Sequence, residues 1–548
     1  MMIEKIRQLL SKDPVEVFNI YEIVTEKNLD LDIEKNKYDF FELAYQALQN
    51  NINPWQVGKI LVKLILFSKY DKNNILNFLK LLYEKEKNTS IHFQITQQLT
   101  KMDKNLALNL LNEFLKIKEE FCIPHIGAIL VELHNTYKIN QFETILEYLD
   151  SKDEFKQKCI IGNIHLFDLS DDKIQIIFKK FNQLINQSPK IDMLIIYNSY
   201  DLIEKGYEYF SNILLKFIDI KNKDIKFAIS QILMFGSEEY LEEDWFEKLF
   251  FSLLNNETSY LINNIDLILG SFLEKDKYQI VEKFLFDWSI KGDLTKVIDN
   301  LNHFIYKLNK SRYFSTFITK ALNYENEKLH SVVSKMLKKP VELDKEILKE
   351  FDFDDYIYVI RKILGYFYEF ETINRMIFSI LKVENLSEDI KNVIKGVITN
   401  FIGKNYPYDT KQFYESLKDE ELNKMEKEVK YFVLETLNQR IENYKKLPYL
   451  KELEPPKNQT KKIHRANNIV MNKIYEKSQK DSFIDLLFTK IPIRYGKGSF
   501  WEINGEISDI SYMQAFESKV RVPIASQAYP IALELEMTMF RLAKKGNK

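Results

Sequence analysis

Apolar residues recur at intervals of three and four positions from about residue 2 to about residue 443. This spacing places them along one face of an α-helix. Ile75, Phe78, Leu79 and Leu82 show it early in the chain. Asn, Asp, Ser and short Lys/Asn clusters interrupt the pattern after each helix-length stretch, as residues at helix ends do. Strand-like alternation is rare in this region, so we predict a long series of helices.

The middle of this series is self-similar. Four segments share the pattern apolar-x-x-apolar-apolar-x-x-apolar, with Asn264 at one weak position, and they begin at Ile225, Leu261, Leu294 and Leu329. Their starts lie 36, 33 and 35 residues apart, and an apolar-rich helix is expected before each segment. A pair of helices this short cannot bury both of its apolar faces alone. It must stack on the next pair, as the units of a helical repeat do.

In its period and its helix pairing, the stretch from about 205 to 340 resembles HEAT/armadillo-type helical repeats. It lacks the Pro, Asp and Arg signature positions of the best examples. The resemblance implies an α-solenoid, which exposes an extended surface for binding. We therefore predict a mainly α fold, an α-solenoid of stacked helix pairs with a small C-terminal module that contains a β-hairpin. A non-repetitive helical bundle is the alternative.

A cluster of prolines marks a boundary near residue 444. Pro448, Pro455 and Pro456 end helices, because proline lacks the backbone N–H and clashes with the preceding turn. The predicted regions are 1–204, an N-terminal helical region; 205–443, the HEAT-like repeat region; 444–480, a Pro/Lys-rich linker and helix; and 481–548, a small α+β module.

The residues that predict β-strands lie in the last region, 481–548. Residues 499–503 and 506–510 flank Asn504-Gly505, a pair that suits a type I′ turn and predicts a hairpin. Residues 519–524 are expected to add a third strand. Pro530 fits the first turn of a closing helix. A module this small buries little core of its own, so we expect it to pack against the helices.

Composition narrows the class of protein. The 548 residues are 45% hydrophobic, and 78 Lys+Arg balance 80 Asp+Glu to a formal net charge of −2. This near-neutrality disfavours a globally basic nucleic-acid binder. Only 14 Gly and 12 Pro are present, whereas an all-β fold needs more such turn residues.

Compartment is inferred from cysteines and hydropathy. Cys122 and Cys159 cannot build a disulfide framework and are expected to be buried thiols in a reducing cytosol. The first residues lack the apolar core of a signal peptide, and no stretch is long and apolar enough for a spanning helix. Abundant Lys, Asn and Ile with few Arg suggest an AT-rich bacterial genome. We expect a cytoplasmic protein without a membrane partner.

One candidate for catalysis lies in the last region. Glu517-Ser518-Lys519, with Asp509 upstream, matches part of a restriction-like nuclease motif. Two carboxylates would hold Mg²⁺ and the lysine would activate water. The pattern is common by chance in a chain rich in Lys and Glu, and a solvated strand face is the default interpretation.

Two basic segments are candidates for binding. The stretch 445–480 is rich in lysine, and a phosphate backbone or an acidic partner could be bound there. A solvated hinge or a protein contact is the favoured interpretation of this stretch. Arg494 and Lys497 flank Gly496 in a segment typical of anion-binding loops, although a turn leading into the hairpin explains it more simply. The candidate binding residues are Lys457, Lys461, Lys462, Arg465, Arg494 and Lys497.

The seven histidines are dispersed, and none has the spacing of a zinc site. Cys122 with His125 resembles a nucleophile pair, but no third partner is apparent. No metal and no small-molecule cofactor is predicted. We therefore expect a non-enzymatic scaffold that binds a protein partner, in a bacterial multi-subunit assembly such as a defence system. The alternatives are a metal-dependent nuclease in the C-terminal module and nucleic-acid binding through 445–480.

Overall fold

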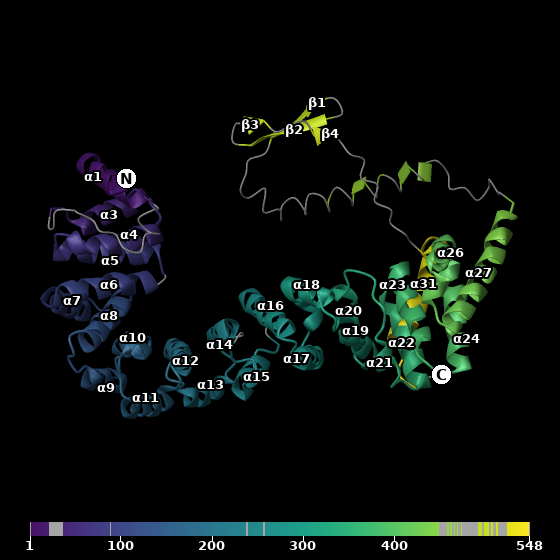
Figure 1. The fold of residues 1–548 in the computed structure, drawn as a ribbon, viewed down its shortest axis with the longest axis horizontal. Helices are drawn as coiled ribbons and strands as arrows, with labels where there is room; N and C mark the ends of the chain where they lie inside the picture. The colour runs from purple at the N-terminus through teal and green to yellow at the C-terminus, as the bar shows by residue number, and fades with distance from the viewer. Residues whose placement is uncertain are drawn as a thin grey trace. The chain divides into compact units, whose positions relative to one another are not determined.

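The computed structural model describes most of the chain (Figure 1). The described residues are 2–20, 37–87, 89–236, 239–255, 258–448, single positions between 458 and 473, 491–495, 498–503, 506–507, 511–512 and 523–546. They are mainly helical, which confirms the predicted mainly α class. Contacts divide the chain into two compact units, Met1–Ser311 and Arg312–Lys548. This division lies inside the predicted repeat region.

Unit 1, Met1–Ser311, consists of helices joined by short turns. Its α-helices are α1 (Met2–Lys12), α3 (Phe40–Gln49), α4 (Pro54–Leu64), α5 (Lys72–Lys85), α6 (Thr89–Met102), α7 (Lys104–Ile117), α8 (Cys122–Asn135), α9 (Phe142–Asp150), α10 (Glu154–Ile161), α11 (Asp171–Leu184), α12 (Pro189–Glu204), α13 (Ser211–Leu214), α14 (Lys223–Gly236), α15 (Asp244–Phe251), α16 (Ser259–Glu274), α17 (Tyr278–Lys291) and α18 (Asn302–Lys310). Its short 3₁₀ helices are η1 (Pro14–Asn19), η2 (Ile65–Phe67), η3 (Ile164–Leu166), η4 (Glu208–Phe210), η5 (Leu215–Phe217), η6 (Leu294–Lys296) and η7 (Ile298–Asn300).

Polar residues between the apolar stretches start many of these helices. The Asp71 carboxylate accepts the backbone N–H groups of Asn73 and Asn74 at the start of α5. Asp39 and Asp103 do the same for α3 and α7. An acceptor at this position satisfies N–H groups that have no partner within the helix. Part of the polar residues that interrupt the apolar pattern therefore act as helix caps.

Alternate helices of unit 1 form a continuous row. Each of α4, α6, α8, α10, α12, α14, α16 and α18 contacts the next in that order, and we call these helices the stacked row. The helices between them pack against it. In Figure 1, α10, α12, α14 and α16 lie along one side of unit 1, and α9, α11, α13 and α15 lie along the other. The arrangement is compatible with a helical repeat.

Polar contacts along the row join residues of successive row helices. The Asn264 amide donates to Ser230 Oγ at 2.8 Å, and Lys59 Nζ donates to Gln94 Oε1 at 2.8 Å. The partners lie 34 and 35 residues apart, respectively. This separation is close to the period found in the sequence, as expected when each unit contacts its neighbours in the chain.

Three of the four predicted repeat segments are α-helices: Ile225 lies in α14, Leu261 in α16 and Leu329 in α20 (Glu327–Met336). The expectation for the segment that begins at Leu294 was wrong, because it forms the 3₁₀ helices η6 and η7. Its apolar residues are nevertheless buried. The α-helix begins later, at α18, where the Asp266 carboxylate from α16 accepts the N–H groups of His303 and Phe304.

Unit 2, Arg312–Lys548, continues with helices and also contains short strands. Its helices are α19 (Phe314–Asn323), α20, α21 (Lys345–Leu348), α22 (Phe353–Tyr366), α23 (Phe370–Ser379), η8 (Ile380–Lys382), α24 (Glu388–Gly396), the π-helix η9 (Val397–Ile402), α25 (Gly403–Asn405), α26 (Pro407–Ser416), η10 (Asp419–Glu421), α27 (Lys424–Lys445), α30 (Ile524–Ala528) and α31 (Pro530–Leu542). Its strands are β1 (Ile491–Tyr495), β2 (Gly498–Ile503), β3 (Glu506–Ile507) and β4 (Ser511–Tyr512).

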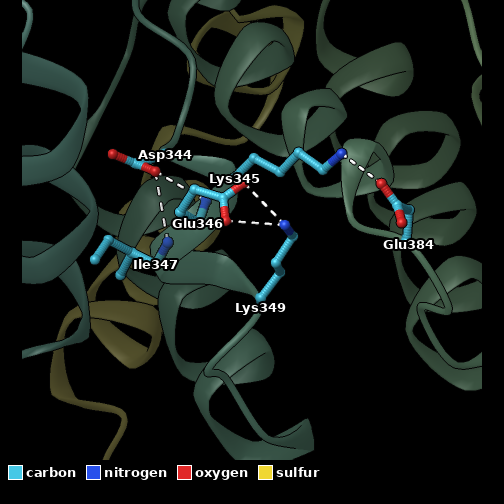
Figure 2. A network of polar contacts seen from close by, with 6 residues as sticks. All are labelled: Asp344, Lys345, Glu346, Ile347, Lys349 and Glu384. Atoms are coloured by element: carbon cyan, nitrogen blue, oxygen red, sulfur yellow. Dashed lines mark hydrogen bonds and ion pairs between the residues drawn. The ribbon is translucent and has the colours of Figure 1, made fainter.

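A network around α21 links neighbouring helices of unit 2 (Figure 2). Asp344 accepts the backbone N–H groups of Glu346 and Ile347 and so caps α21. Lys345 Nζ lies 2.9 Å from Glu384 Oε1 in the turn after η8. This hydrogen bond lowers the pKa of Glu384. The side chains of this exposed charged cluster are paired with one another, as in an ordinary solvated surface.

The strands are described by their backbone pairing. β2 pairs antiparallel with β1, β3 and β4, and Ile503 pairs with Glu506 on either side of Asn504-Gly505. Asn504 and Gly505 lie outside the described residues, and the packing of the α+β module stays a prediction. A third strand was expected at 519–524, but Ile524 is wrong as a strand residue because it begins α30, and 519–522 lie outside the described residues.

Two helix ends of the C-terminal part lie beside prolines that the sequence analysis singled out. α27 ends at Lys445, shortly before Pro448, where proline was expected to stop the helices. The predicted closing helix is α31, and it has Pro530 in its first turn. α31 contacts α22, so this helix packs against the preceding helices as expected.

Candidate polypeptide-docking surfaces

α31 is docked on helices that are far away in the sequence (Figure 1, yellow). It packs on α22, and α30 contacts α25. Leu533 and Met537 are buried, and the ring of Phe540 lies 5.6 Å from that of Phe401 in η9. We call the surface of α22 and η9 that receives α31 the α31 groove. In the rest of the described helical region, most contacts join helices that are close in the sequence, so this docking resembles the binding of a separate peptide.

A glycine allows the close approach of α31. A Cβ atom on Gly365, near the end of α22, would stand 3.0 Å from the backbone N of Arg541 and 3.2 Å from Cβ of Phe540. The Gly365 carbonyl also accepts a hydrogen bond from Arg541 Nε at 2.7 Å. Backbone-to-backbone approach of this kind needs a residue without a side chain.

Lys362 holds the C-terminal end of α31. Its Nζ donates to the carbonyl oxygens of Phe540, Arg541 and Ala543 at 3.4, 2.5 and 2.7 Å. The last carbonyls of a helix lack intrahelical partners and carry partial negative charge, so a cation stabilises them. Lys362 is only 1% exposed. Burial lowers its pKa to about 8, while the carboxylates of Glu327 and Glu325 oppose that shift.

Charged side chains complete the attachment. Arg541 bonds to Glu534 within α31 and donates to Tyr368 Oη at 2.6 Å. Beyond the helix, Lys545 Nζ lies 2.7 Å from Asp355 Oδ1, and its backbone N–H donates to Glu325 Oε1. The groove therefore offers the buried ammonium of Lys362 to the end of α31. It offers carboxylates to Lys545, which lies beyond the helix.

The α31 groove is wider than α31. A cavity of about 430 Å³ lies beside the helix, and its wall is mostly apolar. Its lining includes Ile357, Leu364, Val397, Phe401 and Phe540. Val397 and Phe401 belong to the π-helix η9. Short π-helical turns cost stability and occur frequently at functional sites.

α31 is apolar on two opposite faces. Leu533 and Met537 face the groove, whereas Ile531, Leu535, Met539 and Leu542 are between 60% and 77% exposed. The exposed residues recur at helical spacing and so form one stripe. A surface stripe of four large apolar residues on one short helix exceeds the scattered exposure that is normal for soluble proteins.

A second candidate surface follows the stacked row of unit 1. Phe235 in α14, Leu267 in α16 and Tyr306 in α18 are exposed. Neighbouring helices of the row also meet through aromatic side chains, because the rings of Phe227 and Tyr260 lie 5.0 Å apart, edge to face. Exposed aromatic and apolar residues are more typical of protein-binding surfaces than of surfaces that bind phosphates.

Most of the predicted site residues lie outside the described part of the chain. This holds for Asp509, Glu517 and Lys519 of the nuclease motif, and for Lys457 and Lys497. Lys461, Lys462 and Arg465 are exposed helical residues. Arg494 belongs to β1 and pairs with Ser499 through the backbone, so it lies in a strand and not in the expected turn. Their binding role stays a prediction.

Cys122 and His125 have the properties of ordinary core residues and not of a catalytic pair. Both residues are buried at the start of α8, and burial raises the pKa of Cys122 to about 12. A nucleophilic thiolate needs the opposite shift. His125 Nδ1 lies 2.6 Å from Thr96 Oγ1, and its ring stacks on Phe114 at 5.3 Å. Cys159 is also buried, as predicted.

Comparisons with known proteins do not indicate a function for the chain. No protein-family model matches the chain, and no curated protein matches it. Within the described residues, no cluster of three or more His, Cys, Asp or Glu side chains could hold a metal ion. In that same part of the chain, no helix combines the length and hydropathy that crossing a bilayer requires.

Sequence reasoning missed Lys362, Gly365 and the docking role of Arg541. Two signals were available. Glycine is scarce in this chain, so a glycine inside a strongly apolar helix marks a close approach. In addition, apolar residues occur on both faces of 530–542. Neither signal identifies the partner of α31, because that contact joins residues more than 170 positions apart.

Proposed function

We propose that this chain is a non-enzymatic α-solenoid scaffold of HEAT type that binds a polypeptide partner. The main support is the docked α31 helix, since the helical array already holds a polypeptide helix from a remote part of the chain. Repeat surfaces built from stacked helices are well suited to long polypeptide ligands. Membership of a bacterial multi-subunit assembly and a cytoplasmic location stay predictions.

The exposed residues of the stacked row give the proposal a second support. Phe235, Leu267 and Tyr306 occur on three consecutive helices of the row. Aromatic and apolar side chains are the usual anchors of protein interfaces. A partner that lies along the row would contact several helices at once.

The test is an affinity purification of the tagged full chain from its native host, with charged variants of the two sides of unit 1. Phe235→Lys with Leu267→Lys alters the stacked row, and Ile176→Lys with Ile290→Lys alters exposed positions of α11 and α17. Leu267 and Ile176 are well matched, being 42% and 38% exposed. We expect a stoichiometric protein partner that the stacked-row variant loses and the control retains. A chain that retains no protein, or loses it equally in both variants, would contradict the proposal.

Nucleic-acid binding through 445–480 remains a second candidate, because Lys461, Lys462 and Arg465 are exposed. A mobility shift that weakens steeply with salt and is lost in Lys461→Glu with Lys462→Glu would support it. The nuclease hypothesis is tested by incubation with DNA or RNA and Mg²⁺ or Mn²⁺. Cleavage that Glu517→Ala abolishes would support it, and absence of cleavage would refute it.

A further inference from the structure

We propose that the α31 groove is a docking site for an amphipathic helix of a partner protein, and that α31 occupies it as an exchangeable competitor. The proposal deepens the scaffold function proposed above and rests on it. It names one surface, one kind of ligand and an autoinhibitory contact.

The groove specifies the direction of its occupant. Lys362 is buried, and its Nζ contacts three carbonyl oxygens at the end of α31. A buried ammonium needs acceptors. A helix supplies several free carbonyls only at its C-terminal end. Any occupant must therefore place the end of a helix at Lys362.

The groove also specifies side chains. Leu533, Met537 and Phe540 lie at successive turns on the packed side of α31, and Arg541 follows directly. Four positions after the arginine, Lys545 meets Asp355. The expected ligand has three apolar residues at this spacing, an arginine next to the third, and a basic residue just beyond the helix. The contacts of the arginine with Gly365 and of the basic residue with Asp355 then fix the register of the ligand in the groove.

The fit of α31 is incomplete, which is why we regard it as exchangeable. The cavity of about 430 Å³ beside Phe540 is large enough for side chains that α31 does not provide, and it falls within the usual size of ligand pockets. The four apolar residues of the opposite face contribute little to docking, because they remain exposed. A helix that is integral to a core buries a wider apolar surface.

The experiment uses the full chain and an isotopically heavy synthetic peptide that spans residues 529–546. Hydrogen exchange followed by mass spectrometry reports resident α31 and α22 separately, and the heavy label distinguishes the peptide. Without peptide, we expect α31 amides to exchange at least about 100-fold faster than those of α22, since α31 opens locally. With saturating peptide, resident α31 should lose its remaining protection, whereas α22 should keep its own.

Peptide binding itself is followed by fluorescence anisotropy. The matched control is a peptide with Leu533→Asp and Met537→Asp, which retains the charges that contact the groove but loses the apolar side. We expect at least about tenfold weaker binding of this control. In the protein, Lys362→Met should weaken peptide binding by about tenfold or more. Gly162→Ala should leave it unchanged, because this glycine lies in unit 1 and a Cβ there would come no nearer than 3.4 Å to the atoms around it.

Two results would overturn the proposal. The first is exchange of α31 only together with α22, which would make α31 a permanent part of unit 2. The second is equal binding of the two peptides. Failure here is distinguishable from failure of the scaffold function: if a native partner is captured and lost with the stacked-row variant, while α31 stays protected, the scaffold function holds and this inference does not.

Discussion

The contact between Gly365 and α31 can be tested by adding one methyl group. In Gly365→Ala, the new Cβ would stand 3.0 Å from the backbone N of Arg541 and 3.1 Å from its Cγ. In Gly396→Ala, the new Cβ would meet no heavy atom within 4 Å. Both glycines lie at the ends of helices in the same unit, α22 and α24. The two variants therefore make the same chemical change in different surroundings.

The expected magnitudes follow from these distances. Alanine in a helix is more favourable than glycine by up to about 1 kcal/mol. Crowding of a packed contact costs about 1–3 kcal/mol. Gly396→Ala should thus be neutral or slightly stabilising. Gly365→Ala should weaken the docking of α31 by about 2 kcal/mol relative to that control, which corresponds to roughly 30-fold more frequent opening of α31.

Hydrogen exchange of the full chain measures this effect directly. Amides of α31 should exchange roughly 30-fold faster in Gly365→Ala than in Gly396→Ala. Amides of α12, a helix of unit 1, should not change. Urea denaturation of both variants checks that the fold is retained. Equal exchange of α31 in the two variants would refute the reasoning, because the close backbone approach would then have no energetic consequence.

Three further predictions concern single side chains. Asp266→Ala removes the acceptor for the N–H groups of His303 and Phe304 and should cost about 1–2 kcal/mol in urea denaturation, whereas Asp266→Asn should cost less. Lys362 has a pKa lowered to about 8. Above that pH the folded state binds fewer protons than the unfolded state, so the contribution of Lys362 to the free energy of unfolding rises with pH. Relative to Lys362→Met, the unfolding free energy of the wild-type chain should increase by about 2 kcal/mol between pH 8 and pH 10, and a flat difference would contradict this. Burial lowers the pKa of His330 to about 4, so folding excludes a proton that the unfolded state binds below about pH 6.5. Relative to His330→Phe, the wild-type chain should lose about 2 kcal/mol between pH 7 and pH 4.5, and parallel curves would show that His330 is not the cause.

Helix period and burial were the predictable part of the fold. Ile225, Leu261 and Leu329 lie on buried faces of α14, α16 and α20, because the spacing of apolar residues determines which face a helix buries. Even at Leu294, where the α-helix was wrong, the residues expected to be buried are buried. The error concerns backbone geometry. The start of α18 depends on Asp266, a residue on another helix, which a local pattern does not contain.

The α31 groove could not be predicted for a related reason. Its chemistry is assembled from Lys362, Gly365 and the end of α31, which lie 176 to 181 positions apart in the pairs that meet. A lysine within an amphipathic helix is normally assigned to the solvated face. Lys362 is buried because its amine meets helix-end carbonyls, and only the folded chain brings those carbonyls to it.

The apolar pattern of 530–542 and its observed burial together explain why this helix differs from the others. A helix with apolar residues on both faces is expected to be enclosed on both sides. α31 buries Leu533 and Met537 but leaves Leu535 and Met539 exposed. Its attachment therefore depends on few apolar contacts and on polar bonds at one end, made by Lys362 and Arg541. Polar bonds at a helix end can be made equally well by any helix of the same direction, so this kind of attachment suits a segment that a partner helix replaces.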